Sequence, residues 1–238
     1  MKGLLVRVGA DQTEDGGEWN GPVDTTTGKF VYVSIIEDDK KIKRRFAKPY
    51  KVLGPALKRL GCSLPEHLDS DNMHLDPDFE YLTYGDHNRR ATQIEEKKLG
   101  PGDILVFYAG LRDIHLPKKP KNLVYAIIGI YVIQEIVKAK DVPAGHRHEN
   151  AHTRVVPGET DIVVRAQPGN SGRLGRCIPI GCWRDNAYRV CPAMRKAWGG
   201  LSTDFIQRSV YLPKFLDARR FYAWFQRQRI PLIPQNNE

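Results

Sequence analysis

Two long apolar segments, separated by a short basic stretch, constrain the fold of this chain more than any other feature. The first follows the turn Pro101-Gly102-Asp103 and covers residues 104–111, and the second covers residues 123–136. Pro-Gly-Asp favours a tight turn, and apolar runs rich in Ile, Val and Tyr are typical of buried strands. We therefore expect the two segments to pair as central strands across the basic stretch at residues 118–121.

The remaining pattern alternates short strands with helices. A helix is predicted near residues 52–60, where Gly61 signals its end, and another over residues 214–227, where aromatic side chains share one face. Strands are predicted at residues 4–10, 30–36, 80–86 and 161–165, a short helical segment at 91–99 and a loop at 169–176. This pattern indicates a mixed α/β (α+β) fold, a single domain over residues 1–238 with a central mixed sheet flanked by helices.

Length and apolar content allow a full core and argue against a membrane span. The chain has 238 residues, of which 41% are hydrophobic, and its longest apolar stretch is interrupted by Gln134 and Glu135. The N-terminus lacks the layout of a signal peptide, so we expect a cytoplasmic protein. The four cysteines, Cys62, Cys177, Cys182 and Cys191, form no Cys-x-x-Cys pair. Reduced thiols are favoured over a zinc site.

The charge balance favours a polyanionic partner. Lys and Arg number 37 against 28 Asp and Glu, a net charge of +9. The basic residues gather in runs at 40–45, 118–121, 165–195 and 219–229. Any single run is typical of a solvated surface, but four of them favour nucleic acid bound through its phosphates.

A polar loop between the first two predicted strands brings together acids, amides and an indole. Asp11 and Gln12 follow the first strand, and Trp19, Asn20 and Asp24 precede the second. Such a set suits a planar, polar ligand. The alternative is structural, with Asp11 capping a turn, Asn20 forming one and Trp19 packing in the core.

Ordered motifs along nearly the whole chain resemble the third nucleotide-modification-associated domain family. They are RVGADQT, EWNGPVD, FVYVSIIED, LTYGDHNRR, LGPGDILVFYAGLR, YAIIGIYVI, NAHTR, DIVVRAQPGNSGRLGRCIPIG and WGGLSTDFIQRSVYLP. The resemblance implies a role beside systems that make, read or attack modified DNA bases, often in conflict between bacteria and phages. It therefore implies double-stranded DNA with modified bases as the partner.

A protein that handles one base of a duplex must take it out of the stack, which requires phosphate contacts, a stacking platform and groups for the base edge. Candidates for phosphate contact are Arg154, Arg173 and Arg176, of which the last two lie in a Gly-rich segment. Candidates around the base are Trp19 and Tyr84 for stacking, Gln12 and Asn20 for its edge, and Ser202 and Asp204 for the pocket wall.

Excision of the base would pass through an oxocarbenium-like state that a carboxylate stabilises. Asp11 is the first candidate because it directly follows a strand, and Asp24 and Asp86 are the second. His152 would orient the leaving base or contact a phosphate. The sequence thus predicts a DNA glycosylase acting on a modified cytosine of phage DNA. The alternative is a reader module that binds the base without chemistry.

Neither a metal nor a nucleotide cofactor is predicted. No glycine-rich nucleotide fingerprint or P-loop occurs in the sequence. The histidines His146, His148 and His152 form the one regularly spaced group, and it lacks a local partner that would define a metal. His146 and His148 are predicted to be exposed loop residues.

Overall fold

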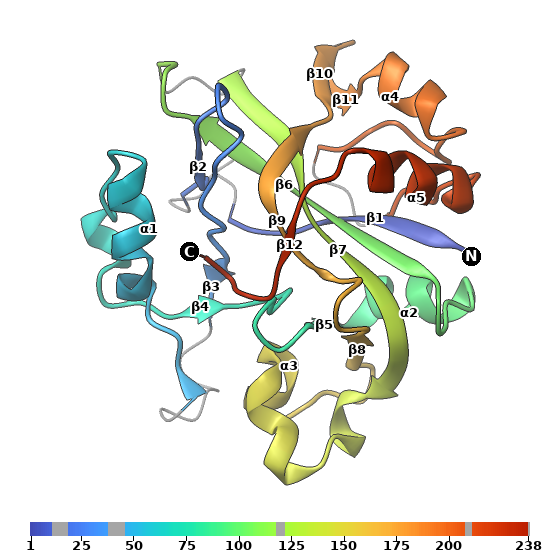
Figure 1. Ribbon diagram of the computed structural model, residues 1–238. Coiled ribbons are helices and arrows are strands. Elements are labelled where there is room, and N and C mark those ends of the chain that lie inside the picture. Colours follow the sequence, from blue (N-terminus) through green and yellow to red (C-terminus); the bar gives the residue numbers. More distant parts are fainter. Residues whose placement is uncertain (11–18, 38–45, 118–121, 208–210, 238) are drawn as a thin grey trace.

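The computed structural model describes residues 1–10, 19–37, 46–117, 122–207 and 211–237. Within them, an eight-stranded mixed sheet crosses the molecule, with the strand order β1-β6-β7-β8-β5 along its main path (Figure 1). Its strands are β1 (Gly3–Arg7), β2 (Pro22–Val23), β5 (Thr83–Asp86), β6 (Ile104–Asp113), β7 (Leu123–Lys138), β8 (Ile162–Ala166), β9 (Gly172–Pro179) and β12 (Leu232–Ile233). Two small sheets accompany it, β3 (Ile35–Ile36) with β4 (Met73–His74) and β10 (Gly181–Arg184) with β11 (Ala187–Val190).

The predicted central pair is present. β6 and β7 run antiparallel with Ile104 opposite Val132 and Arg112 opposite Leu123. Gly102 supplies the turn before β6 with φ +83°, a conformation that glycine adopts without strain. β1 adds to the other edge of β6 in parallel, so that the sheet is mixed as predicted. β7 is long enough to pair with β9 near its middle and with β8 at its end.

Apolar cores cover both faces of this sheet, which explains the long apolar runs at residues 104–111 of β6 and 123–133 of β7. Leu4, Val6 and Phe107 contribute to the core on one face, while Leu5 and Val106 contribute to the core on the other. Successive residues of a strand point to opposite faces, so each uninterrupted apolar run feeds both cores. The uninterrupted apolar runs in the sequence are therefore explained by burial of the sheet on both faces.

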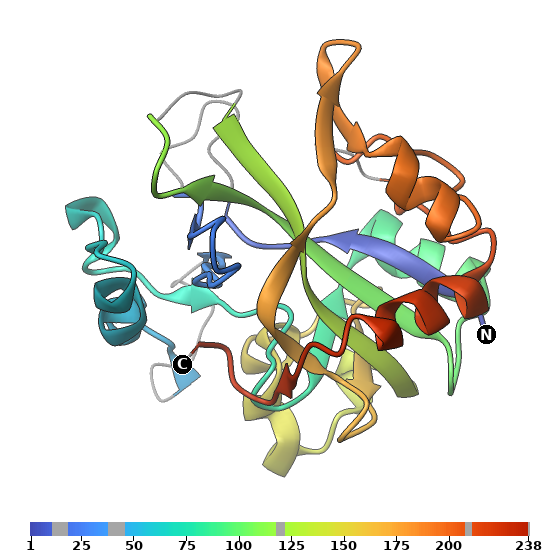
Figure 2. The same cartoon turned by 45° about the horizontal axis from the view of Figure 1, so that its top comes forward.

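Helices stand on both sides of the sheet. They are α1 (Gly54–Arg59), α2 (Asn88–Glu96), α3 (Ala151–Arg154), α4 (Pro192–Ala197) and α5 (Ala218–Arg227), with short 3₁₀ helices at Tyr50–Leu53, Glu66–Leu68, Ala139–Asp141 and Ala144–Glu149. Figures 1 and 2 show α1 on one side and α5 on the other. α5 begins at Ala218, later than the predicted residue 214, so that Phe215 precedes the helix. Of the predicted face, Phe225 is buried and Tyr222 is partly buried, and Phe221 is buried beside them. The helix before Gly61 is also confirmed.

Two local predictions differ from the structure. The Gly-rich segment at 169–176, predicted as a loop, contains the start of β9, because pairing with β7 and β12 outweighs the low strand propensity of glycine. Gly172 has no room for a side chain because the backbone of Ile233 lies against it. In the segment 30–36 only Ile35–Ile36 forms a strand, although Phe30 makes an isolated bridge to Val23.

The prediction of reduced thiols is wrong for one pair of cysteines. Cys182 and Cys191 form a disulfide with their Cα atoms 5.2 Å apart, whereas Cys62 and Cys177 are free. The β10–β11 hairpin places Cys182 opposite Arg189, and Cys191 follows the end of β11. Sequence spacing alone does not reveal this approach, because it depends on where the hairpin turns.

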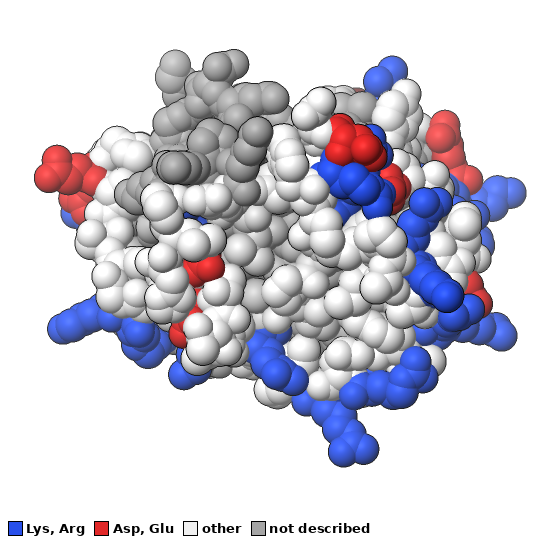
Figure 3. All heavy atoms as spheres, turned by 90° about the horizontal axis from the view of Figure 1, so that it is seen from above, with Lys and Arg blue, Asp and Glu red and all other residues white. Residues whose placement is uncertain are grey.

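In the part of the chain that the structure describes, no helix combines the length and apolar character needed to cross a membrane. Figure 3 shows one face of the molecule, with Lys and Arg side chains along its lower and right-hand edges and mainly uncharged residues between them. Among the described residues on this face, the positive charge lies mainly toward these edges, with one further group beside carboxylates near the top.

Candidate functional site

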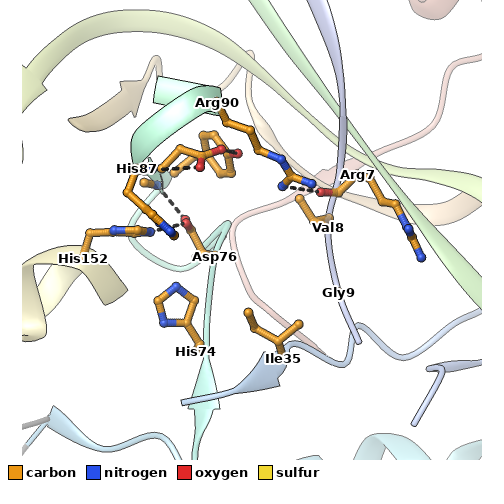
Figure 4. Close-up of a pocket in the computed structure, with 12 residues that line it drawn as sticks. Arg7, Val8, Gly9, Ile35, His74, Asp76, His87, Arg90 and His152 are labelled. Atoms are coloured by element: carbon orange, nitrogen blue, oxygen red, sulfur yellow. Dashed lines mark hydrogen bonds and ion pairs between the residues drawn. The ribbon is translucent and has the colours of Figure 1, made fainter. Parts of the chain in front are cut away.

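A polar pocket of about 310 Å³ lies where β1, β4, β5 and α3 approach one another (Figure 4). Its wall combines three imidazoles, two carboxylates and two guanidinium-bearing residues with a few apolar groups. The lining residues are Arg7, Val8, Gly9, Ile35, His74, Asp76, Tyr84, Gly85, Asp86, His87, Arg90 and His152. Because these residues come from distant parts of the chain, the tertiary structure creates the pocket.

The β3–β4 ladder supplies one wall. Ile35 lies opposite His74 in the antiparallel register, and Glu37 follows directly after β3. His74 Nδ1 lies 3.0 Å from both carboxylate oxygens of Glu37, whose side chain is buried. Asp76 follows His74 by two residues, a spacing that places alternate side chains of an extended chain on one side. His74 and Asp76 therefore reach the same pocket.

α3 supplies His152 from the opposite direction. Asn150 caps the helix by accepting the backbone N–H of His152 at 2.9 Å, and its amide donates to Asp76 Oδ1 at 3.3 Å. The N–H of Gly85 on β5 donates to the same oxygen at 2.6 Å. A Cβ atom on Gly85 would clash with His152 and Asn150, so glycine lets β5 pass close beneath the imidazole.

Two carboxylates hold the ring of His152. Nε2 lies 3.3 Å from Asp76 Oδ2 and Nδ1 lies 3.4 Å from Asp161 Oδ2. Burial alone would lower the pKa of His152, but the hydrogen bonds to Asp161 and Asp76 outweigh it and raise this pKa to about 10. The hydrogen bond from His152 in turn lowers the pKa of Asp161. The two neighbouring carboxylates therefore favour the protonated form of this imidazole.

The pKa of Asp86 is raised, whereas the pKa of Asp161 is lowered. Burial raises the pKa of Asp86, although Tyr84 donates its hydroxyl to Asp86 Oδ2 and the backbone N–H of His87 donates to Oδ1. Burial also acts on Arg90 and lowers its pKa, but Tyr84 and Asp86 outweigh that effect, and the net shift is upward. Asp86 is therefore a carboxyl that holds its proton more tightly than an exposed aspartate, beside a permanent cation.

Three residues predicted from the sequence meet here: Tyr84, Asp86 and His152. Asp24 lies elsewhere and accepts from Thr27 while pairing with His115 at 3.0 Å. Asn20 is buried and donates to Gly110 O at 2.8 Å, and Trp19 packs against the core. Asp24, Asn20 and Trp19 are absent from the lining of this pocket. The two other members of the predicted loop, Asp11 and Gln12, lie outside the described residues.

The arginines proposed for phosphate contact differ in accessibility. Arg154 is fully buried in an ion pair with Asp78, and its side chain has no access to a phosphate. Arg173 is also buried, donates to Gln235 O and Leu174 O, and stacks on Phe30. Both positions correct the prediction, because each guanidinium is enclosed by the fold. Arg176 is exposed at the surface.

Ser202 and Asp204 lie away from the pocket, near the β10–β11 hairpin. Asp204 accepts from Arg184 at 2.6 Å and from Arg189 at 2.9 Å. Ser202 accepts the backbone N–H of Lys214 at 2.8 Å. Their contacts link the hairpin to the chain that follows it, and neither residue lines the pocket around Asp86.

Sequence reasoning missed His74, Asp76 and Arg90. The prolines and aspartates around His74 and Asp76 favour a loop rather than a functional site. The one detectable signal of this segment is the alternation His74-Leu75-Asp76, where the intervening leucine is buried and the two polar residues face the pocket. The partners of His74 and Asp76 come from other segments, so their role required the folded structure.

Comparisons with known proteins bear on the chain as a whole. The family model described as nucleotide modification associated domain 3 matches residues 2–197, a span that includes every residue lining the pocket. No curated protein and no solved structure matches the chain.

Proposed function

Because the chain belongs to the nucleotide modification associated domain 3 family, we propose that its pocket receives one modified base of double-stranded DNA and cleaves the N-glycosidic bond of that base. The observation that carries this proposal is the buried carboxyl of Asp86, whose raised pKa suits it to donate a proton. It shares the pocket with a second carboxyl group, that of Asp76. Two carboxyl groups in different environments are the pair that glycoside hydrolysis typically uses, and cleavage of a sugar–base bond is analogous.

The size and chemistry of the pocket suit a single base. A volume of about 310 Å³ has room for one planar ring system but not for a base pair. Val8 and Ile35 offer apolar contact, and His87 offers a ring nitrogen to the edge of the base. A base would enter only after leaving the stack, as in other enzymes that act on single bases of DNA.

The proposed reaction separates charge between the base and the sugar. The electron pair of the C1′–N bond leaves with the base, and the proton of Asp86 neutralises it. Positive charge develops on the sugar, and the carboxylate of Asp76 stabilises it. Water then adds at C1′ and gives up a proton to the Asp86 carboxylate, which restores the carboxyl group that protonated the base. The products are the free base and an abasic site.

Basic residues at the pocket support DNA as the partner. Arg90 lies in the wall, and Arg89 on the preceding position of α2 is exposed. Guanidinium groups beside an opening favour phosphate contacts, which position a duplex without reading its sequence. The net charge of +9 acts in the same direction.

Incubation of the protein with matched duplexes tests the proposal. One duplex contains a single modified cytosine, such as 5-hydroxymethylcytosine or its glucosylated form, and the other contains cytosine. We expect free modified base by mass spectrometry and alkali-labile abasic sites in the first duplex only. Asp86→Asn should slow release about 100-fold or more, while Asp24→Asn, whose carboxylate lies outside the pocket, should act at the parent rate.

Two outcomes would contradict the assignment. Equal rates for Asp86→Asn and the parent would show that this pocket does not perform the reaction. Tight, modification-dependent binding that leaves the DNA chemically intact would instead identify a reader module, the alternative that the sequence also allows.

A further inference from the structure

Three side chains of the pocket present potential metal ligands to one another. His74, Asp76 and His152 each offer one ligand atom, and these atoms lie within 4.8 Å of one another. Ligands of a single ion lie about 3–4 Å apart when each is ~2.1 Å from it, so small side-chain rotations would bring all three onto one ion. Figure 4 shows the ring of His74 beneath Asp76 and His152.

Both imidazoles are oriented as metal ligands are. Glu37 engages Nδ1 of His74 at 3.0 Å, and Asp161 lies 3.4 Å from Nδ1 of His152. In each ring this leaves Nε2 as the atom that faces the cluster. A carboxylate behind a histidine defines its tautomer and increases its basicity, which is the usual arrangement behind metal-bound histidines. It occurs here twice, on segments that are distant in sequence.

Charge and burial favour a cation at this point. Three carboxylates, those of Glu37, Asp76 and Asp161, surround the two imidazoles. The side chains of Asp76 and His152 are each only 8% exposed, so water screens this negative charge poorly. Asn150 and Gly85 already hold the other oxygen of Asp76, which leaves Oδ2 directed at the cluster.

We propose that His74, Asp76 and His152 bind a divalent transition-metal ion through two Nε2 atoms and one carboxylate oxygen. Two imidazoles and a carboxylate suit zinc, iron(II), cobalt(II) or manganese(II), and they do not suit calcium or magnesium, which prefer oxygen ligands. Three protein ligands leave further coordination positions for a water molecule at the pocket. If the protein excises a base as proposed above, that water would be the one that adds at C1′. Only this role of the water rests on the proposed function, and metal binding itself does not.

Metal binding is tested without DNA, so its failure and the failure of base excision are distinguishable. The full chain, stripped with a chelator, is titrated with Co²⁺ and then with competing Zn²⁺. We expect one equivalent to bind, with d–d absorption but without a thiolate charge-transfer band. His74→Ala should abolish stoichiometric binding, and Glu37→Gln, which retains all three ligands, should weaken it about 10–100-fold. The matched control is His146→Ala, since His146 is an exposed histidine that pairs with Glu149 outside the cluster.

A measurement on the unsubstituted protein tests the proposal even if the variants fail to fold. In the Co²⁺-loaded chain, proton NMR should show two exchangeable, strongly shifted resonances, one from each Nδ1–H, because ligation through Nε2 leaves both protons in place. Binding well below one equivalent would overturn the proposal, as would equal affinity in the parent and a folded His74→Ala variant. A Co²⁺ complex without these two resonances would overturn it as well.

Discussion

The imidazole rings of His74 and His152 meet edge to face with their centroids 5.2 Å apart, although one belongs to β4 and the other to α3. Each ring has its own carboxylate partner behind it, Glu37 or Asp161, and Asp76 stands beside both. The cluster joins three separate segments in one polar wall. The proposed metal site depends on that wall, and the proposed base excision depends on Asp76 within it and on Asp86.

The hydroxyl of Tyr84 tunes the acidity of Asp86. Its hydrogen bond stabilises the ionised carboxylate and so opposes the effect of burial. Tyr84→Phe removes that donor, and the pKa of Asp86 should rise further. A reaction that needs protonated Asp86 is lost as pH rises through this pKa, so the alkaline limb of the pH–rate profile should move to higher pH in the variant.

Measured rates of base release across pH check this shift. Tyr81→Phe is the matched control, because Tyr81 packs against His148 and does not line the pocket. If Tyr84→Phe and the parent had superimposable profiles, Asp86 would not be the proton donor.

Gly85 is needed for the close approach of β5 to α3. In Gly85→Ala the added methyl group would clash with Cδ2 of His152 and Oδ1 of Asn150. We expect a loss of about 1–3 kcal/mol in the free energy of unfolding, measured by urea denaturation, together with loss of the His152–Asp76 contact. Gly54→Ala is the control, because nothing lies within 4 Å of a methyl group there and its stability should stay within ~0.5 kcal/mol of the parent.

The buried pair of Arg154 and Asp78 maintains the fold. Both side chains are fully buried, so Arg154→Met leaves an uncompensated carboxylate in the interior and should cost about 3–5 kcal/mol. Adding Asp78→Asn removes that charge and keeps an acceptor for Asn236, so the double variant should be more stable than Arg154→Met alone. Denaturant unfolding measures both.

Arg176→Met is the comparison for this series, because an exposed arginine should contribute less than ~0.5 kcal/mol. A double variant less stable than Arg154→Met would mean that the pair is not the source of the loss.

The stability of the β10–β11 hairpin should depend on pH through Asp204. Burial would raise the pKa of Asp204, but the hydrogen bond and charge of Arg189, with the charges of Arg184 and Arg195, lower it overall. A lowered pKa contributes stability above the unfolded value of 3.8, and this contribution is lost as pH falls through the folded pKa. Asp204→Asn should therefore cost about 1–3 kcal/mol at neutral pH and much less near pH ~2.

Urea denaturation at the two pH values gives the difference. Asp185→Asn provides the control, since this carboxylate is 71% exposed, lies 3.5–3.6 Å from the same arginines and should change stability little. An equal loss at both pH values would exclude ionisation of Asp204 as the cause.

Hydrophobic periodicity within a segment was enough to predict the strands and helices that are buried along a regular face. The paired strands around residues 104–111 and 123–133 are apolar at successive positions, and Ala218 and Phe225 share one helical face, so their burial follows from periodicity. β9 was missed because its glycines are poor strand formers, and only pairing with β7 and β12 stabilises it there. The disulfide was not predicted because the approach of Cys182 to Cys191 depends on where the β10–β11 hairpin turns.

In the candidate site, too, some residues could be identified from local sequence and others only from contacts between distant segments. Asp86 and His152 were identified because they stand in short polar motifs next to predicted elements. Their partners His74, Asp76 and Glu37 were not, because no local pattern relates the β3–β4 ladder to α3.

The amino-acid sequence by itself determined the two-sided sheet, its central strands, the C-terminal aromatic helix and the family to which the chain belongs. These features depend on residue periodicity and on the order of motifs along the chain, and both can be read without knowing which distant segments come into contact. Only the tertiary structure decided that Arg154 is buried, that Asp24 lies outside the pocket and that His74, Asp76 and His152 converge. The physical reason is that burial and proximity of polar groups depend on strand register and on packing between distant segments.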